Sequence, residues 1–173
     1  LARGMWRMAR RNALINRLSA VETLGGTDVI LTDKTGTLTE NKMTVSNLVL
    51  EPFDTDVDEI EGSLEESSID EGGMEKRELL RQALEIGVLC NNASLGEDEN
   101  VGDPLEVSLL EAAHKFGLER KDLVQKYPEV REVAFDSDVK MMATYHRKKG
   151  GFRIAVKGET EEIIEKSDSI VTG

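Results

Sequence analysis

One short stretch of this sequence combines a carboxylate, several hydroxyls and a glycine in an order suited to phosphate chemistry. Asp33 follows the apolar residues 29–31, which we expect to form a short buried strand, because open α/β sheets place reacting groups at the carboxyl ends of strands. Gly36 lets the backbone approach a phosphate closely, and the hydroxyls of Thr35 and Thr37 can donate to its oxygens. A carboxylate in such a loop can attack a phosphorus atom once a cation such as Mg2+ offsets the repulsion between two anions. The predicted product is an aspartyl phosphate.

Residues 33–39, Asp-Lys-Thr-Gly-Thr-Leu-Thr, match the phosphorylation motif of P-type cation-transporting ATPases at every position. This resemblance implies that Asp33 is the phosphorylated nucleophile, that Thr35, Gly36 and Thr37 bind phosphate, and that Asp33 and Thr35 contribute to a Mg2+ site. A phosphatase of the haloacid dehalogenase superfamily is the neighbouring alternative, since its loop resembles Asp-x-Asp. The second carboxylate of such a loop helps to discharge the intermediate. This chain has Thr35 there, which favours a persistent acyl phosphate.

A second set of candidate residues lies in the last third of the chain. Segments with strand character, separated by two turn sequences, cover residues 131–135, 140–147 and 152–157. Phe135 could stack on a purine base, and the ammonium groups of Lys140 and Lys157 could meet its phosphates. The structural alternative is a core ring and two surface lysines.

Three segments resemble motifs of the nucleotide-binding domain of the same pumps. Residues 134–142 resemble Phe-Asp-Ser-x-x-Lys-x-Met, residues 156–158 resemble Lys-Gly-Ala, and residues 102–110 resemble Gly-Asp-Pro-x-Glu-x-x-Leu-Leu. The resemblance implies that the ATP pocket is formed by Glu106, Phe135, Lys140, Lys157 and Gly158, with Glu106 beside the adenine amino group and Phe135 stacked on adenine.

Glu106 and Glu159 also have a structural interpretation. Asp103 suits the N-cap of a helix that Gly117 ends, and Glu106, three residues after the cap, fits a capping box as well as a nucleotide site. Glu159 stands where the family usually has Ala, and its carboxylate could repel phosphates or cap the helix expected at residues 160–166.

The elements that position these residues follow from periodicity and charge. The first 19 residues carry five arginines and no acid, and we expect a basic helix, either solvated or a stalk continuing a membrane helix. Residues 8–25 resemble the stretch that follows the fourth membrane helix of type II pumps. Residues 51–75 are acidic without Lys or Arg, which favours a solvated, mobile loop over a cation site. Core-facing apolar spacing predicts a helix over residues 76–92, and a short polar helix is expected over residues 119–126.

The composition excludes several classes of protein. A formal net charge of −12 argues against nucleic-acid binding. Cys90 is the single cysteine, so no disulfide can form within the chain, and we expect it in the core. Since no run of about 18 apolar residues occurs, these 173 residues are not expected to span a bilayer.

The expected fold class is α/β (α+β), an antiparallel sheet flanked by helices and preceded by a partial haloacid-dehalogenase-like phosphorylation segment. We expect a stalk helix at residues 1–22, the N-terminal part of a phosphorylation domain at 23–42, and a nucleotide-binding domain, incomplete at its C-terminal end, at 43–173. A hinge near residues 41–46 would let the two domains close during catalysis.

The resemblance implies the cytoplasmic catalytic part of an ATP-driven type II pump, of the calcium-type or bacterial cation-transporting kind, in a bacterial or archaeal cell membrane. Its cofactors would be ATP and Mg2+. Its partners would be the membrane domain, the actuator domain and the second half of the phosphorylation domain, with the membrane reached only through transmembrane helices outside this chain. The chain alone is expected not to turn over ATP, because those parts supply further catalytic groups. The alternatives are a non-catalytic ATP-binding module and a phosphatase.

Overall fold

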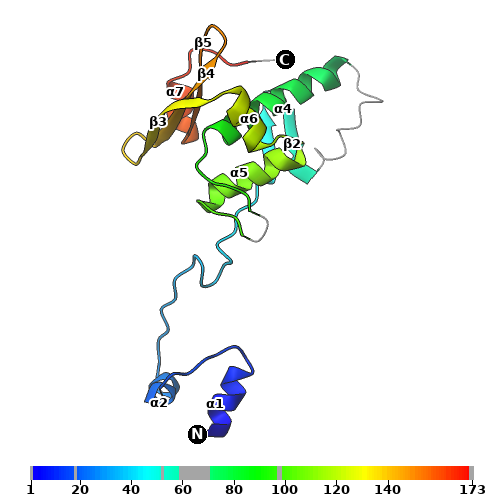
Figure 1. Cartoon of the computed structure of the whole chain (residues 1–173). Helices are drawn as coiled ribbons and strands as arrows, with labels where there is room; N and C mark the ends of the chain where they lie inside the picture. Colours follow the sequence, from blue (N-terminus) through cyan, green and yellow to red (C-terminus); the bar gives the residue numbers. More distant parts are fainter. Residues whose placement is uncertain (1, 18, 52, 59–70, 97–98, 172–173) are drawn as a thin grey trace. The chain divides into compact units, whose positions relative to one another are not determined.

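The computed structural model describes residues 2–17, 19–51, 53–58, 71–96 and 99–171 (Figure 1). The chain divides into two compact units, Leu1–Asn41 and Lys42–Gly173, called here the N-terminal and the C-terminal unit. Across the described ranges, no helix is both long and apolar enough to cross a membrane.

In the described part of the N-terminal unit the first 19 residues do not form one helix, so the basic helix expected there is interrupted. Helix α1 spans Ala2–Ala9 and helix α2 spans Ser19–Gly25. Between them Asn12 has a φ of +61°, a left-handed conformation that interrupts a right-handed helix. Helices this short gain little from their own hydrogen bonds and depend on packing for their stability.

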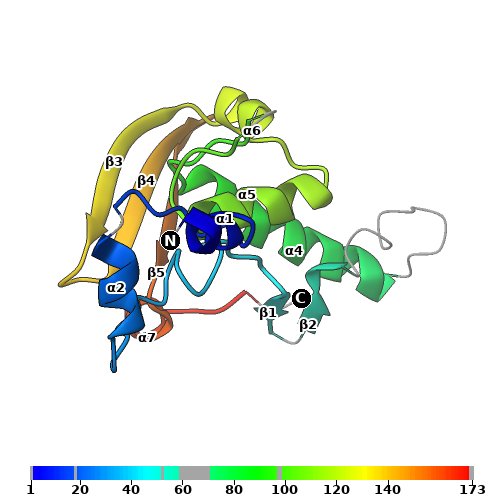
Figure 2. The same ribbon diagram turned by 90° about the horizontal axis from the view of Figure 1, so that it is seen from below.

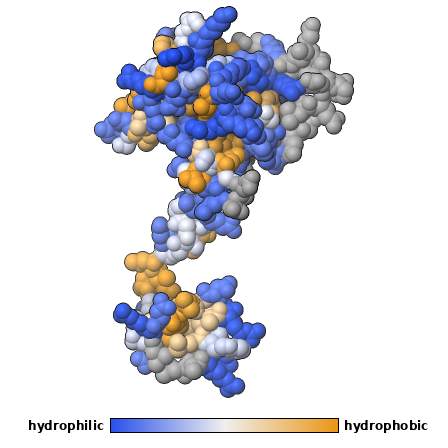
Figure 3. All heavy atoms as spheres, viewed as in Figure 1, coloured by the Kyte–Doolittle hydropathy of each residue, from blue (hydrophilic) through white to orange (hydrophobic). Residues whose placement is uncertain are grey.

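The expected buried strand before Asp33 is also absent. Val29, Ile30 and Leu31 have no regular secondary structure and are 70%, 75% and 94% exposed. No strand occurs anywhere in the described part of the N-terminal unit, so this apolar run has no neighbour with which to form a hydrogen-bonded ladder. Apolar side chains therefore appear on the surface of this unit (Figure 3).

The C-terminal unit combines helices with antiparallel sheets, which confirms the expected α+β fold class. Its elements are β1 (Asn47–Leu50), β2 (Phe53–Asp56), α4 (Glu71–Leu89), α5 (Pro104–Lys115), α6 (Arg120–Lys126), β3 (Glu129–Asp136), β4 (Met141–Lys148), β5 (Gly151–Gly158) and α7 (Thr160–Glu165). Strand β1 pairs with β2, and β3, β4 and β5 form a second antiparallel sheet in that order. Figure 2 shows α4 and α5 on the same side of this sheet.

The core of the C-terminal unit lies around α4, which packs against α5, α6, β1 and β5. Cys90, directly after α4, is completely buried as expected, and its thiol donates to the carbonyl oxygen of Met142 at 3.6 Å. Burial raises the pKa of the Cys90 thiol. The main apolar residues of this core are Val57, Leu80, Leu84, Val88, Leu89, Ala93, Leu110, Ala113, Phe116, Leu123, Met142 and Ala155.

Strand β5 has one inward-facing side, but this side does not carry its large apolar residues. Ala155 is buried, whereas Phe152, Ile154 and Val156 remain 59%, 53% and 39% exposed. The inward side also carries Arg153 and a lysine, and both are paired with carboxylates from helices. The side of β5 that faces the helices thus carries paired charges as well as Ala155, and the large apolar residues lie on the other side.

The acidic segment at residues 51–75 is partly ordered. Strand β2 lies within it, and α4 begins at Glu71, five residues before the helix start expected from the sequence. The carboxylate of Asp58 accepts a hydrogen bond from Lys115 at 2.7 Å. Residues 59–70, about half of the predicted mobile loop, lie outside the described residues.

Helix α5 begins and ends as its sequence predicts. Its N-cap is Asp103, whose carboxylate accepts from the Leu105 N–H at 2.9 Å, and Pro104 is the first helical residue. Gly117 has a φ of +77° and donates to His114 O, as in a Schellman motif. Leu105, in the first turn of this helix, is 43% exposed.

Candidate functional site

The loop after Asp33 is a compact turn that closes on itself. The backbone N–H groups of Leu38 and Thr39 donate to the carbonyl of Lys34 at 3.0 and 3.2 Å. Gly36, with a φ of +73°, occupies the left-handed position in this turn. The Thr39 hydroxyl donates to the same Lys34 carbonyl and accepts from the Gly36 N–H, at 3.3 and 3.4 Å. Thr39 thus holds the loop together.

The groups predicted to meet phosphate are accessible. Asp33 is exposed, and one of its carboxylate oxygens accepts from the Lys34 N–H at 2.8 Å. Thr35, Gly36 and Thr37 are exposed as well. The second carboxylate oxygen of Asp33 is therefore open to an approaching electrophile, and it is not packed into an interior.

The donor set around Asp33 does not make up a Mg2+ site on its own. Mg2+ prefers six oxygen ligands in near-octahedral geometry, usually with one or two carboxylates and several waters. No group of three or more His, Cys, Asp or Glu that could hold a metal ion occurs among the described residues. Asp33 and Thr35 can supply only part of a coordination shell.

The strand register brings the predicted nucleotide residues of the sheet to one end of it. Asp136 pairs with Met141 across β3 and β4, and Met141 pairs with Gly158 across β4 and β5. Phe135 and Lys140, each adjacent to one of these positions, therefore lie at the same end as Lys157 and Gly158. Phe135 is 62% exposed, so its ring is accessible for stacking.

The turn between β3 and β4 fixes the backbone at Lys140. The Asp136 carboxylate accepts from the N–H groups of Asp138 and Val139 at 2.8 and 3.2 Å, and the Asp136 carbonyl accepts from the Lys140 N–H at 2.6 Å. Lys140 has a φ of +52°, which is uncommon for a residue with a long side chain. The side chain of Asp136 thus stabilises the turn, and its ordering role explains the acidic sequence there.

Gly158 permits a close approach between β5 and the start of β4. A Cβ atom at this position would lie 2.6 Å from the carbonyl oxygen of Lys140, which is too short for any real contact. The N–H of the next residue, Glu159, donates to that carbonyl at 3.0 Å. Gly158 therefore has a packing role at the site, in addition to the nucleotide-binding role expected for it.

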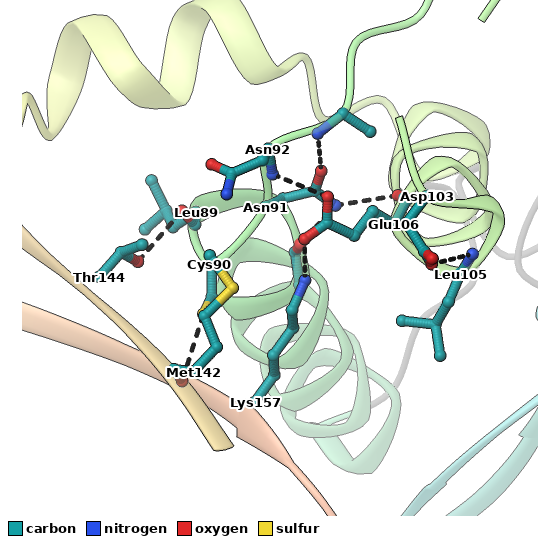
Figure 4. A network of polar contacts seen from close by, with 12 residues as sticks. Leu89, Cys90, Asn91, Asn92, Asp103, Leu105, Glu106, Met142, Thr144 and Lys157 are labelled. Atoms are coloured by element: carbon teal, nitrogen blue, oxygen red, sulfur yellow. Dashed lines mark hydrogen bonds and ion pairs between the residues drawn. The ribbon is translucent and has the colours of Figure 1, made fainter. Parts of the chain in front are cut away.

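Glu106 and Lys157 form the centre of a polar network between α4, α5 and β5 (Figure 4). One oxygen of Glu106 lies 2.5 Å from the ammonium group of Lys157, and the other accepts from the Asn92 N–H at 3.1 Å. The two side chains are only 13% and 21% exposed. The capping-box interpretation of Glu106 is wrong, because its carboxylate turns toward the end of α4 and Asp103 alone caps α5.

Asn91 supports this arrangement and was not singled out from the sequence. Its side-chain amide donates to the carbonyl oxygens of Gly87 and Glu106 at 3.1 and 2.9 Å, and its side-chain oxygen accepts from the Ala93 N–H at 2.8 Å. Asn91 is completely buried. The sequence signal is an Asn directly after an apolar helical run, because a side-chain amide there can bond to backbone groups at the helix end.

A buried carboxylate at Glu85 was also missed. Glu85 is 1% exposed and is paired with Arg81 on the same helix and with Arg153 on β5, both at 2.5 Å. The guanidinium of Arg153 lies 5.1 Å from the centre of the Tyr127 ring. In the sequence, Glu85 is the single charged residue between Ala83 and Leu89, and a carboxylate within such an apolar run needs a partner if it is buried.

A separate cavity of about 280 Å3 lies between the end of α5 and the start of α6. Leu110, His114, Leu118 and Arg120 contribute to its wall, together with Ser94. None of the predicted nucleotide residues lines it. This cavity is thus separate from the predicted nucleotide site.

Comparison with known proteins defines the class to which this chain belongs. Residues 79–173 match the family described as P-type ATPase, cytoplasmic domain N. This match covers more than half of the chain, so the chain is a member of the P-type ATPase family.

Individual relatives are named cation pumps. The chain is 35% identical over 171 residues to calcium-transporting ATPase 1 of Bacillus cereus, covering 99% of this chain and 18% of that protein. It is 37% identical over 171 residues to calcium-transporting ATPase 1 of Lactococcus lactis, with 98% and 18% covered. It is 39% identical over 183 residues to calcium-transporting ATPase 1 of Saccharomyces cerevisiae, again with 98% and 18% covered. The chain thus spans under a fifth of these relatives, and since one is from yeast, a bacterial or archaeal source is not supported.

Proposed function

We propose that this chain is the nucleotide-binding and phosphorylation-site portion of an ATP-driven cation-transporting pump. The observation that carries the proposal is the position of Phe135, Lys140 and Lys157 at one end of the sheet, with Glu106 paired to Lys157. The names of the relatives, which are calcium-transporting and cation-transporting ATPases, support the same class of function.

Each residue at the sheet end has a role that its chemistry permits. The exposed ring of Phe135 stacks on adenine, and the Glu106 carboxylate accepts from the adenine amino group. Lys140 and Lys157 supply positive charge for the phosphates. Because Glu106 is already held by Asn92 and Lys157, it is oriented before any nucleotide arrives.

Asp33 is the proposed acceptor of the phosphoryl group. A carboxylate oxygen of Asp33 forms a bond to the γ-phosphorus of ATP, the bond to the bridging oxygen breaks, and ADP leaves. Thr35 occupies the position where a second carboxylate would act as an acid or base, so the acyl phosphate is expected to persist. Mg2+ is a cofactor of the proposed reaction, and Asp33 and Thr35 would hold it together with water and the phosphate oxygens of the nucleotide.

A phosphoenzyme assay on the whole protein tests the assignment of Asp33. The protein that contains this chain should form an acid-stable, hydroxylamine-labile product with γ-labelled ATP. Asp33→Asn should abolish the label, whereas the matched control Asp28→Asn, at another exposed carboxylate nearby, should retain it. Retention of label in Asp33→Asn would refute the assignment.

The nucleotide site is tested separately on the 173-residue chain. The affinity for ATP, measured by a titration that follows amide chemical shifts, should be lower in Phe135→Ala. Phe152→Ala is the matched control, because Phe152 is 59% exposed and pairs with Arg147 toward the other end of the same sheet. Equal affinity in the two variants would remove the support for this site.

A non-catalytic nucleotide-binding module is the second candidate, since the matched range of the cytoplasmic domain N is residues 79–173, and Asp33 lies outside that range. We propose that the chain alone binds ATP without turning it over, and that other segments of the pump place it at the cytoplasmic side of a membrane. Steady release of phosphate from small phosphoesters by the chain would instead favour a phosphatase.

A further inference from the structure

Glu159, which follows Gly158, contacts the lysine across the end of the sheet. Its carboxylate lies 2.5 Å from the ammonium group of Lys140, and its backbone N–H donates to the Lys140 carbonyl at 3.0 Å. Glu159 is the N-cap residue of α7, but its side chain makes no capping hydrogen bond. The sequence offered two interpretations of Glu159, repulsion of phosphates and capping of the helix, and the capping interpretation is therefore wrong.

Both lysines of the proposed nucleotide site are paired with carboxylates, but the two pairs differ in accessibility. In the Lys157–Glu106 pair the side chains are 21% and 13% exposed, and Glu106 is also bonded to the backbone of α4's end. In the Lys140–Glu159 pair they are 52% and 42% exposed. The Lys140–Glu159 pair can therefore open to solvent without breaking the polar network beneath it.

We propose that Glu159 competes with nucleotide phosphates for Lys140, and so weakens binding in proportion to the charge of the phosphate chain. This inference rests on the proposed function of the sheet end as a nucleotide site. Glu159 is a specificity-determining residue in this view, because it selects against the phosphates and leaves binding of the nucleoside unchanged.

The surrounding charges favour this role. Glu159 raises the pKa of Lys140 by a hydrogen bond and by its charge, so Lys140 is an ammonium over the physiological range. Glu162 adds a smaller attraction to Lys140, but its carboxylate is held by Lys166 at 2.5 Å. Glu159 is thus the carboxylate that a phosphate must displace from Lys140.

The size of the effect follows from the exposure of the pair. Displacing an exposed ion pair lowers the apparent affinity of a competitor by up to about fivefold. Repulsion between Glu159 and a multiply charged phosphate chain adds a further few-fold at low salt. Removing the charge of Glu159 should therefore tighten ATP binding by about tenfold and leave adenosine binding unchanged.

The test measures dissociation constants of adenosine, AMP, ADP and ATP with the 173-residue chain at low ionic strength. Glu159→Gln should tighten binding progressively from AMP to ATP, and the gain should shrink when salt is added. Glu161→Gln is the matched control, because this substitution removes the same charge from an exposed residue of α7, and the carboxylate that pairs with Lys140 is that of Glu159. The titration of the Lys140 ammonium, followed by NMR, should move to lower pH in Glu159→Gln only.

Three results would overturn the proposal. The first is an equal gain in Glu159→Gln and Glu161→Gln, which would indicate general charge alone. The second is an equal change for adenosine and ATP, which would indicate a structural effect. The third is an unaltered Lys140 titration, which would deny the ion pair. If the unmodified chain binds adenosine but Glu159→Gln changes nothing, the inference fails and the proposed function stands; if no nucleotide binds, both fail.

Discussion

Because the Glu85 carboxylate is buried, we expect the stability of the C-terminal unit to depend on Arg153 of β5, which pairs with it. The two carboxylate oxygens are paired with Arg81 and Arg153, and Glu85 is 1% exposed. Arg153→Met keeps much of the aliphatic stem but leaves one buried oxygen without its partner. Breaking a buried ion pair by removing one partner costs about 3–5 kcal/mol. Because Arg81 remains bonded to the carboxylate, we expect a loss of about 2–3 kcal/mol in the free energy of unfolding.

Urea unfolding followed by far-UV circular dichroism measures this loss, because most of the helices and strands lie in the C-terminal unit together with β5. With a slope of about 2 kcal/mol/M, the midpoint should fall by about 1 M. Arg147→Met is the control, because Arg147 is exposed at the end of β4, and it should shift the midpoint by less than about 0.3 M. The double variant Glu85→Leu/Arg153→Met should recover most of the stability. Equal midpoints for Arg153→Met and Arg147→Met would refute the reasoning.

Three further outcomes can be measured on the same chain. Gly158→Ala should lower the unfolding free energy by about 1–3 kcal/mol, because its Cβ would meet the Lys140 carbonyl at 2.6 Å; an unchanged urea midpoint would contradict this. Glu106→Gln should cost about 1–2 kcal/mol, between the values for exposed and buried pairs, since it loses the ion pair with Lys157 but can still accept from a backbone N–H; a Lys157→Met background should remove most of that loss in a double-mutant cycle. The raised pKa of Cys90 favours the neutral thiol in the folded state. The stability that this thiol contributes is complete at pH values below its pKa in the unfolded chain, and it is lost as the pH rises through its pKa in the folded chain. Stability should therefore fall as the pH rises above the ordinary thiol pKa of about 9.0, and Cys90→Ala should flatten that decline, whereas an identical slope would argue against it.

The sequence predicted the helices and strands whose ends carry capping residues or turn sequences. Asp103, Pro104 and Gly117 delimit α5 because capping and left-handed geometry depend on a few neighbouring residues. The three long strands were predicted because turn sequences separate them. Phe135, Lys140 and Lys157 were recognised from motifs, and the antiparallel register then places them at one end of the sheet.

Predictions that depended on distant partners failed. The run at residues 29–31 has the composition of a strand, but without a neighbouring strand in the described part of its unit it remains exposed coil. The basic segment of the first 19 residues has helical spacing, yet its helix ends at Ala9 and Asn12 is left-handed. The capping box at Glu106 satisfied a local rule, and a lysine 51 residues away in the chain attracts the carboxylate more strongly.

The sequence by itself determined the family, the identity of the groups that can do chemistry and the extent of most helices and strands in the C-terminal unit. These features depend on residue types and on short spacings along the chain, and both are visible in the sequence. Only the tertiary structure decided which carboxylate meets which lysine, and which side of β5 is buried. The reason is physical: ion pairs form between residues far apart in the chain, and burying a charge is tolerable only where the fold supplies its partner.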